Sequence, residues 1–177
     1  LSNNLRKILL SPPLPNNIVM GINTEDWTNA KSAIISEDGK LLAYTILRPD
    51  IKDFYSKKSI ETISTLKNLV NKYNINFIAI SNGKGSREFN RLLAYCFKNK
   101  LERRVLQKYT VNRVGSDYIA KQSKAIKKYA NLDLGVLKAL SIARRLQNPL
   151  TELTKIEPQA ITLDNEQCDY SLALVEK

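Results

Sequence analysis

A short apolar run at residues 18–22 constrains what this chain can fold into. The run follows a proline-rich break at residues 12–15 and reads Ile-Val-Met-Gly-Ile. Apolar residues at both odd and even positions indicate a strand that is buried on both faces, in the middle of a sheet. The sequence therefore predicts a fold built around a central strand that ends at Asn23.

Two more strands are expected directly after the first. They cover residues 31–36 and 41–47, and the segment Glu37-Asp38-Gly39-Lys40 between them is typical of a hairpin turn. Pro49 and Asp50 end the third strand. We therefore expect the first three strands to form an antiparallel meander.

Helices alternate with strands in the next part of the chain. We expect a helix that is capped by Ser59 and a strand at 76–80, then a helix that is capped by Ser86 and a strand at 108–112. A helix between two such strands favours a parallel pair joined by a crossover.

Two helices are predicted after the fifth strand. One runs from about Asp117 to Ala130, and the other covers residues 134–147, with Asn131 or Asp133 as its cap. The order β-β-β-α-β-α-β-α-α predicts an α/β protein with a ribonuclease H-like fold. We expect a mixed five-stranded sheet, with the meander first and helices flanking it.

Residue content excludes several classes of site. The 177 residues suit one domain and include no histidine, so a histidine base and histidine zinc ligands are excluded. Cys96 and Cys168 cannot form an all-cysteine zinc site, and we expect two free thiols rather than a disulfide. No apolar run is long enough to span a membrane, and no signal peptide is visible. We predict a cytoplasmic protein without a cofactor or a membrane partner.

Positive charge is concentrated in one part of the chain. The net charge is +11, and residues 98–128 hold ten basic residues against two acidic ones. Lys121, Lys124 and Lys128 have the spacing of one helix face. Phosphate contacts there would give weak, salt-dependent binding to RNA or DNA. A solvated basic face is the alternative.

A glycine-containing turn follows the fourth strand. It reads Ser81-Asn82-Gly83-Lys84-Gly85-Ser86-Arg87-Glu88 and leads into a helix. Backbone N–H groups at a helix N-terminus bind anions, and Lys84, Ser86 and Arg87 would assist. The spacing of a P-loop is absent. An ordinary strand-to-helix turn is the alternative interpretation.

Three segments of the chain carry recognisable motifs. The first segment is residues 4–14, and the second is the turn at residues 81–88. The most specific segment is 139–158, which reads Ala-Leu-Ser-Ile-Ala-Arg-Arg-Leu-Gln-Asn-Pro-Leu-Thr-Glu-Leu-Thr-Lys-Ile-Glu-Pro. Together they resemble the YqgF-type domain of the Tex family of bacterial transcription accessory proteins, and the resemblance covers almost the whole chain in the family's order.

The resemblance implies a domain within a larger protein that also carries helical, helix-hairpin-helix and S1 nucleic-acid-binding modules. Residues 1–15 would end an upstream helical region, residues 16–160 would form the YqgF domain, and residues 161–177 would begin the helix-hairpin-helix region. The implied partners are nucleic acid, other domains of the same chain and the transcription machinery.

The chain departs from the family pattern at two places that matter for chemistry. The family's first strand usually ends in an aspartate, where this chain has Asn23, and an acidic position after the fifth strand is Arg113. Ribonuclease H-type cleavage uses two hard cations held by carboxylates. Asn23 lacks the charge, and Arg113 would repel a metal ion. The sequence therefore predicts no catalytic residues.

An enzymatic function stays open as an alternative hypothesis, because Glu25 and Asp26 follow the first strand closely and could replace the missing carboxylates. Our leading hypothesis is a non-catalytic module that associates with RNA or DNA, or acts as a scaffold, in transcription. A metal-dependent nuclease similar to a Holliday-junction resolvase is the first alternative. A protein-interaction platform is the second.

Overall fold

The computed structural model describes residues 13–50, 52–97, 106–122 and 129–156. The apolar run is β1 (Val19–Asn23), and all five of its residues are buried, as expected for a strand that is covered on both faces. Residues 1–12 of the upstream helical region expected at 1–15 lie outside the described residues.

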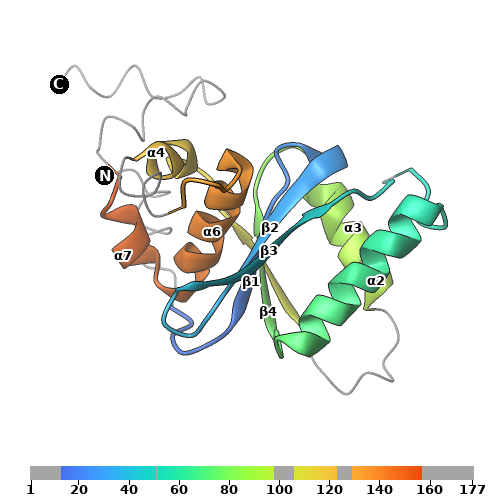
Figure 1. Cartoon of the computed structure of the whole chain (residues 1–177), viewed down its shortest axis with the longest axis horizontal. Helices are drawn as coiled ribbons and strands as arrows, with labels where there is room; N and C mark the ends of the chain where they lie inside the picture. The colour runs from blue at the N-terminus through green and yellow to red at the C-terminus, as the bar shows by residue number, and fades with distance from the viewer. Residues whose placement is uncertain (1–12, 51, 98–105, 123–128, 157–177) are drawn as a thin grey trace.

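The predicted order of elements is confirmed (Figure 1). After β1 come η1 (Trp27–Asn29), β2 (Ala30–Ile35), β3 (Leu41–Leu47), α2 (Lys57–Lys72), β4 (Phe77–Ser81), α3 (Ser86–Cys96), β5 (Gln107–Val111), α4 (Ser116–Lys121), α6 (Leu134–Gln147) and α7 (Pro149–Leu153). Strand boundaries differ from the prediction by about one residue, which is the usual precision of such assignments.

The five strands form one mixed sheet in the order β3-β2-β1-β4-β5. β2 pairs antiparallel with both β1 and β3, which confirms the meander. β1 and β4 are parallel, and so are β4 and β5. The carboxyl ends of β1, β4 and β5 therefore meet at one edge of the sheet.

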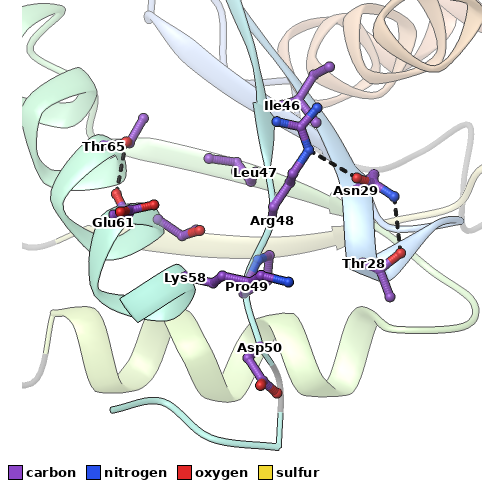
Figure 2. A pocket seen from close by; sticks show the side chains of 11 residues that line it. Thr28, Asn29, Ile46, Leu47, Arg48, Pro49, Asp50, Lys58, Glu61 and Thr65 are labelled. Atoms are coloured by element: carbon purple, nitrogen blue, oxygen red, sulfur yellow. Dashed lines mark hydrogen bonds between the residues drawn. The ribbon is translucent and has the colours of Figure 1, made fainter. Parts of the chain in front are cut away.

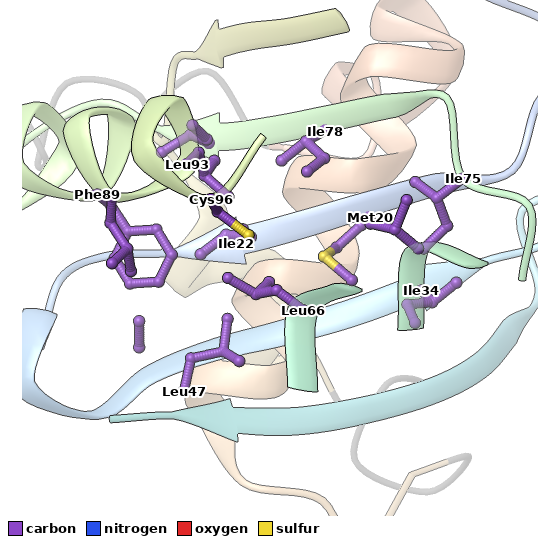
Figure 3. Close-up of a cluster of buried hydrophobic side chains, with 14 residues drawn as sticks. Met20, Ile22, Ile34, Leu47, Leu66, Ile75, Ile78, Phe89, Leu93 and Cys96 are labelled. Atoms are coloured by element: carbon purple, nitrogen blue, oxygen red, sulfur yellow. The ribbon is translucent and has the colours of Figure 1, made fainter. Parts of the chain in front are cut away.

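Each face of the sheet has its own core. Alternate residues of β1 point to opposite faces: Met20 and Ile22 pack with α2 and α3 (Figure 3), and Val19 packs with α6. Figure 1 shows α2 and α3 on one side of the sheet and α4, α6 and α7 on the other. Cys96 is buried in the first core; Cys168 lies outside the described part of the chain.

Gly21 sets the distance between the sheet and α6. A Cβ atom on Gly21 would lie 2.1 Å from the carbonyl oxygen of Ala139 and 2.8 Å from the Cβ of Ala143. Only glycine allows this approach. The close contact fixes α6 across β1 and so determines where α6 side chains reach the edge of the sheet.

Two expected helix caps are wrong. Ser56, not Ser59, caps α2, because the helix begins three residues earlier than expected. The hydroxyl of Ser59 instead donates to the backbone carbonyls of Asp50 and Asp53. At α3 the cap position is Gly85, in the left-handed conformation (φ +80°), and no side chain caps the helix.

The helix expected from about residue 117 to 130 is shorter in its described part. α4 ends at Lys121, and Gln122 is extended. Residues 129–132 form a turn rather than the end of a helix. Asp133 caps α6 by accepting the N–H of Gly135, as one of the two expected caps. No helix in the described segments is long and apolar enough to cross a membrane.

Candidate functional site

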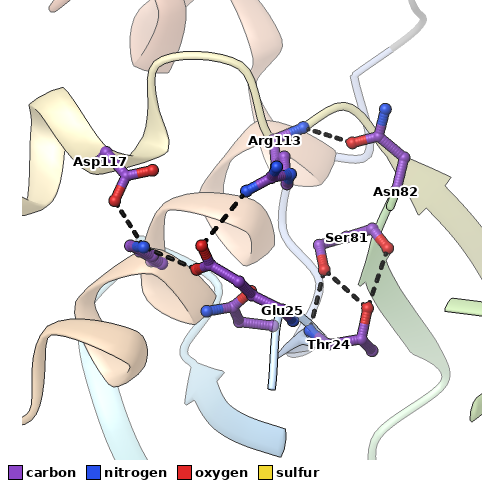
Figure 4. A network of polar contacts seen from close by, with 8 residues as sticks. Thr24, Glu25, Ser81, Asn82, Arg113 and Asp117 are labelled. Carbon is purple, nitrogen blue, oxygen red and sulfur yellow. Dashed lines mark hydrogen bonds and ion pairs between the residues drawn. The ribbon is translucent and has the colours of Figure 1, made fainter. Parts of the chain in front are cut away.

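The carboxyl ends of the parallel strands, where Asn23 and Arg113 depart from the acidic family pattern, are joined by neutral hydrogen bonds. The Thr24 N–H donates to Ser81 Oγ at 2.9 Å, and the two hydroxyl oxygens are 3.1 Å apart. The Arg113 N–H donates to Asn82 Oδ1 at 2.8 Å (Figure 4). Asn23 is buried, and its Oδ1 accepts the N–H of Glu25 at 3.3 Å. These contacts join the ends of β1, β4 and β5.

Several charged side chains form ion pairs next to these strand ends. The ammonium of Lys138, on α6, is 2.6 Å from Glu25 Oε2 and 2.5 Å from Asp117 Oδ1. Arg113 Nη1 is 3.5 Å from Glu25 Oε1. We call Glu25, Arg113, Asp117 and Lys138 the strand-end cluster (Figure 4 shows these ion pairs). It brings together two carboxylates and two cations from three separate parts of the chain: the loop after β1, the segment from β5 to α4, and α6.

Lys138 is the most buried member of the cluster, with 10% of its side chain exposed. It belongs to the second turn of α6, whose residues from Val136 to Ala143 are all buried. Burial lowers the pKa of Lys138, but hydrogen bonds to Asp117 and Glu25 outweigh it, so the pKa lies above its ordinary value. The ammonium therefore stays charged at neutral pH.

The chain's own cations pair with both carboxylates of the strand-end cluster. Glu25 and Asp117 share the ammonium of Lys138, and Glu25 also faces Arg113. Within the described ranges, no three acidic, cysteine or histidine residues lie together as a metal-binding group. Because Mg²⁺ requires carboxylate oxygens that are free to bind it, these residues do not fit such an ion.

Asp26, the other candidate replacement for a catalytic carboxylate, has a different role. Its side chain caps η1 by accepting the N–H groups of Thr28 and Asn29, at 3.1 and 3.2 Å. The side chains of Thr28 and Asn29 also donate to it, and these hydrogen bonds lower the pKa of Asp26. Its carboxylate is therefore used locally, in the loop after β1.

The residues expected to contact phosphate divide into two groups. Lys84 and Arg87 are exposed in and just after the β4–α3 turn, and Ser86 is half-buried at the first position of α3. Gly83, in the same turn, lies under Arg113: a Cβ there would be 3.3 Å from Arg113 Nε. The turn therefore adjoins the strand-end cluster.

Lys121, from the expected basic helix face, is exposed at the end of α4. Lys124 and Lys128 lie outside the residues that the structure describes. The structure therefore gives no geometry for the complete row of lysines.

Sequence reasoning missed the roles of Lys138 and Asp117. Lys138 interrupts an apolar run in a helix that is otherwise buried, and a lysine is rarely buried without a partner. That interruption was the available signal. It could have indicated a buried ion pair, although not which carboxylates complete it.

An open pocket of about 620 Å³ lies between the end of β3 and α2 (Figure 2). Its charged lining residues are of both signs: Arg48, Asp50, Lys58 and Glu61. Arg48 Nε donates to Asn29 Oδ1 at 3.1 Å across its rim. The lining favours no particular ligand, because it carries two basic and two acidic side chains and the Arg48 guanidinium already donates to Asn29.

The sequence of the chain matches a known protein family. The model of the Tex protein YqgF-like domain matches residues 17–147. The chain is 32% identical over 170 residues to YdcI of Bacillus subtilis, covering 96% of this chain and 23% of YdcI. It is 30% identical over 174 residues to the transcriptional accessory protein Tex of Neisseria gonorrhoeae, covering 98% of this chain and 22% of Tex.

A human relative is also similar: the S1 RNA-binding domain-containing protein 1 of Homo sapiens is 31% identical over 174 residues, which cover 98% of this chain and 17% of that protein. The chain thus spans about a fifth of the length of the relatives it matches.

Among solved structures, Thermus thermophilus RuvC in complex with a Holliday junction substrate is similar in fold, with a TM-score of 0.55. The identity is 11%, and the match covers 77% of this chain and 96% of RuvC. A second structure of Thermus thermophilus RuvC gives a TM-score of 0.52. The predicted ribonuclease H-like fold is confirmed. The chain belongs to the Tex family, and residues 17–147 are its YqgF-like domain.

Proposed function

We propose that this chain is a non-catalytic, pseudo-nuclease module of a Tex-like transcription accessory protein, and that it contributes to association with RNA or DNA. The proposal depends on one observation above all. The Lys138 ammonium lies between the carboxylates of Glu25 and Asp117, 2.6 and 2.5 Å from them, at the strand ends. A metal ion would have to displace a buried, tethered cation to reach the same oxygens.

Electrostatics add a second argument against metal-dependent cleavage. A divalent ion at the strand ends would lie near Lys138 and Arg113, and like charges repel strongly where water is partly excluded. Asn23, at the end of β1, offers one neutral oxygen, and that oxygen already accepts the N–H of Glu25. The proposal therefore assigns no catalytic residue and no cofactor.

Net charge supports association with a polyanion. The chain carries +11, and Lys84 and Arg87 are exposed in and just after the β4–α3 turn, whose Gly83 approaches Arg113. We propose Lys84, Ser86, Arg87 and Lys121 as nucleic-acid contacts, with Arg113 as a secondary one because it faces Glu25. Such contacts give weak binding that decreases as salt increases.

The same proposal covers the surroundings of the module. We propose a cytoplasmic protein in which residues 1–15 end an upstream region and residues 161–177 begin the next. Other domains of the same chain and the transcription machinery would be its partners. The relatives named for transcription accessory activity and S1 RNA binding support this assignment.

A combined binding and cleavage assay tests the proposal. The 177-residue chain is incubated with fluorescein-labelled four-way-junction DNA, duplex DNA and an RNA hairpin, with Mg²⁺, with Mn²⁺ or with a chelator. We expect binding that is unaffected by the chelator and no cleavage. Binding should weaken strongly between about 50 and 200 mM salt.

Two results would contradict the proposal. Metal-dependent cleavage that is lost in Glu25→Gln would restore the nuclease alternative. Absence of binding to every nucleic acid at low salt would favour the protein-interaction alternative.

A further inference from the structure

One face of α3 presents two arginines and a tyrosine in a row. Arg87, Arg91 and Tyr95 are spaced four residues apart, so they lie on the same side of the helix. All three are exposed, whereas Phe89, Leu92, Leu93 and Cys96 turn the other side of α3 into the core. At 1.5 Å per residue the row is about 12 Å long.

A cluster of three aromatic side chains, Phe54, Tyr55 and Tyr95, lies at the end of this row. The ring of Tyr95 is 5.7 Å from that of Phe54, and 5.7 Å from that of Tyr55 in an edge-to-face arrangement. Tyr55 is 75% exposed and Tyr95 is 39% exposed. Phe54 packs against the core, so it fixes the position of this aromatic cluster. A large, exposed aromatic surface is therefore held in place beside two cations.

The cations of the row are available for an external partner. None of the ion pairs found in the described segments uses Lys84, Arg87 or Arg91. Glu88, which is half-buried, is the acid nearest along α3 to Arg91, three residues before it. With Lys84 in the preceding turn, this surface carries three basic residues and one acidic residue, Glu88.

We propose that Lys84, Arg87, Arg91, Tyr95 and Tyr55, the α3 track, bind a single-stranded nucleic acid. In this arrangement the basic side chains contact successive phosphates, and an unpaired base stacks on Tyr55. The row spans roughly three to four nucleotides at the 3.4 Å rise of stacked bases. The inference rests on the proposed association with nucleic acid and adds the strand class and the residues.

The aromatic cluster favours a single strand over a duplex as the partner. Bases in a duplex stack on each other, and their faces are inaccessible to a surface ring, whereas a single strand offers an unstacked base. Arginines alone would contact either form. The basic row also favours a polyanion over an apolar protein partner, which would have to leave Arg87 and Arg91 solvated at its interface.

Fluorescence of a labelled single strand tests the proposal with the 177-residue chain. The probes are a short poly-pyrimidine strand, in DNA and RNA versions, that contains one 2-aminopurine, and a duplex of the same length. We expect tighter binding to the single strands than to the duplex, and quenching of 2-aminopurine on binding. Tyr55→Ala should weaken single-strand binding about tenfold and remove the quenching, and Tyr55→Trp should retain both.

Matched controls separate stacking from general effects on the surface. Tyr44→Ala removes another exposed tyrosine, 53% exposed on β3, and should leave affinity unchanged. Arg87→Ala/Arg91→Ala should reduce the slope of log affinity against log salt by about 1 to 2. Lys72→Ala, at the other end of α2 from Tyr55, should leave that slope unchanged.

The outcomes are distinguishable from those for the proposed function. If the chain binds nucleic acid but Tyr55→Ala behaves like Tyr44→Ala, or the duplex binds as tightly as the single strand, the α3 track is wrong and the broader proposal stands. If neither probe binds at low salt, both fail, and this face serves a protein partner or none.

Discussion

The strand-end cluster and the α3 track use positive charge in opposite ways. In the strand-end cluster, Lys138 is buried and its ammonium contacts two carboxylates. On the α3 track, Arg87 and Arg91 are exposed, and none of the ion pairs within the described segments includes them. The two regions are connected through the β4–α3 turn, where Gly83 lies under Arg113.

Under the proposed function, the difference explains how a nuclease-like fold binds nucleic acid without a metal site. Charges that pair with each other inside the protein attract little from solution, and removing one destabilises the fold because its partner is left unpaired. Charges that face water contribute little to stability and remain available to phosphates. Substitutions in the two regions should therefore have opposite profiles, with losses of stability in the first and losses of affinity in the second.

The largest loss of stability is expected for Gly21→Ala, which breaks the support of the strand-end cluster. The new methyl group would overlap the carbonyl of Ala139, so α6 must move away from β1. We expect a loss of about 3 kcal/mol, or a decrease of roughly 6–12 °C in melting temperature. Thermal unfolding followed by circular dichroism measures it. As a control, Gly39→Ala, strained at φ +76° but not crowded, should cost less.

Lys138→Met should give the next largest loss. It leaves the carboxylates of Glu25 and Asp117 without their shared cation, and breaking a buried pair costs about 3–5 kcal/mol. Because Glu25 is 45% exposed, we expect about 2 kcal/mol in urea unfolding.

The triple variant Lys138→Met/Glu25→Gln/Asp117→Asn should recover most of this loss, because no unpaired charge remains. A triple variant as unstable as the single one would mean that the lysine contributes through packing and not through its charge.

Asp26→Ala should have a smaller effect, because it removes a cap on the exposed loop after β1. We expect a loss of about 1 kcal/mol. The lowered pKa of Asp26 also gives a pH dependence: its contribution is present above the ordinary pKa and is lost as pH falls through the lower, folded value. Urea unfolding at neutral and acidic pH measures both. An equal loss at both pH values would contradict the capping role.

Arg87→Ala/Arg91→Ala should have the smallest effect on stability, below about 0.5 kcal/mol, because both side chains are exposed. Its affinity for a single strand should nevertheless fall. Parallel measurements of unfolding and of oligonucleotide binding check the contrast. If stability fell as far as in Lys138→Met, the division between the two regions would be wrong.

The fold was predictable because its strands carry strong local signals. β1 is apolar at every position but one, and the turn at Asp38-Gly39 fixes the hairpin. The caps at Ser59 and Ser86 were mispredicted because several serines and glycines compete near each helix start, and local hydrogen bonds to Asp50 and Asp53 decided the first case.

The candidate site was predictable only in part. Asn23 and Arg113 could be identified as departures from the family pattern, since both lie within motifs. The ion pairs of Lys138 could not be predicted, because they join residues 113 and 21 positions away in sequence, and their geometry depends on the close packing of α6 on Gly21. The local pattern shows only a lysine within an apolar run and does not identify the distant carboxylates that pair with it.

Manganese binding tests the central claim most directly, because it asks whether the chain's own cations have replaced the metal. Free Mn²⁺ is measured by electron paramagnetic resonance for the wild-type chain and for Asn23→Asp/Arg113→Ala/Lys138→Ala, up to about 1 mM Mn²⁺. We predict no specific site in the wild-type chain and a new site in the variant. A wild-type chain that binds Mn²⁺ at one site, and loses it on Glu25→Gln, would contradict the account.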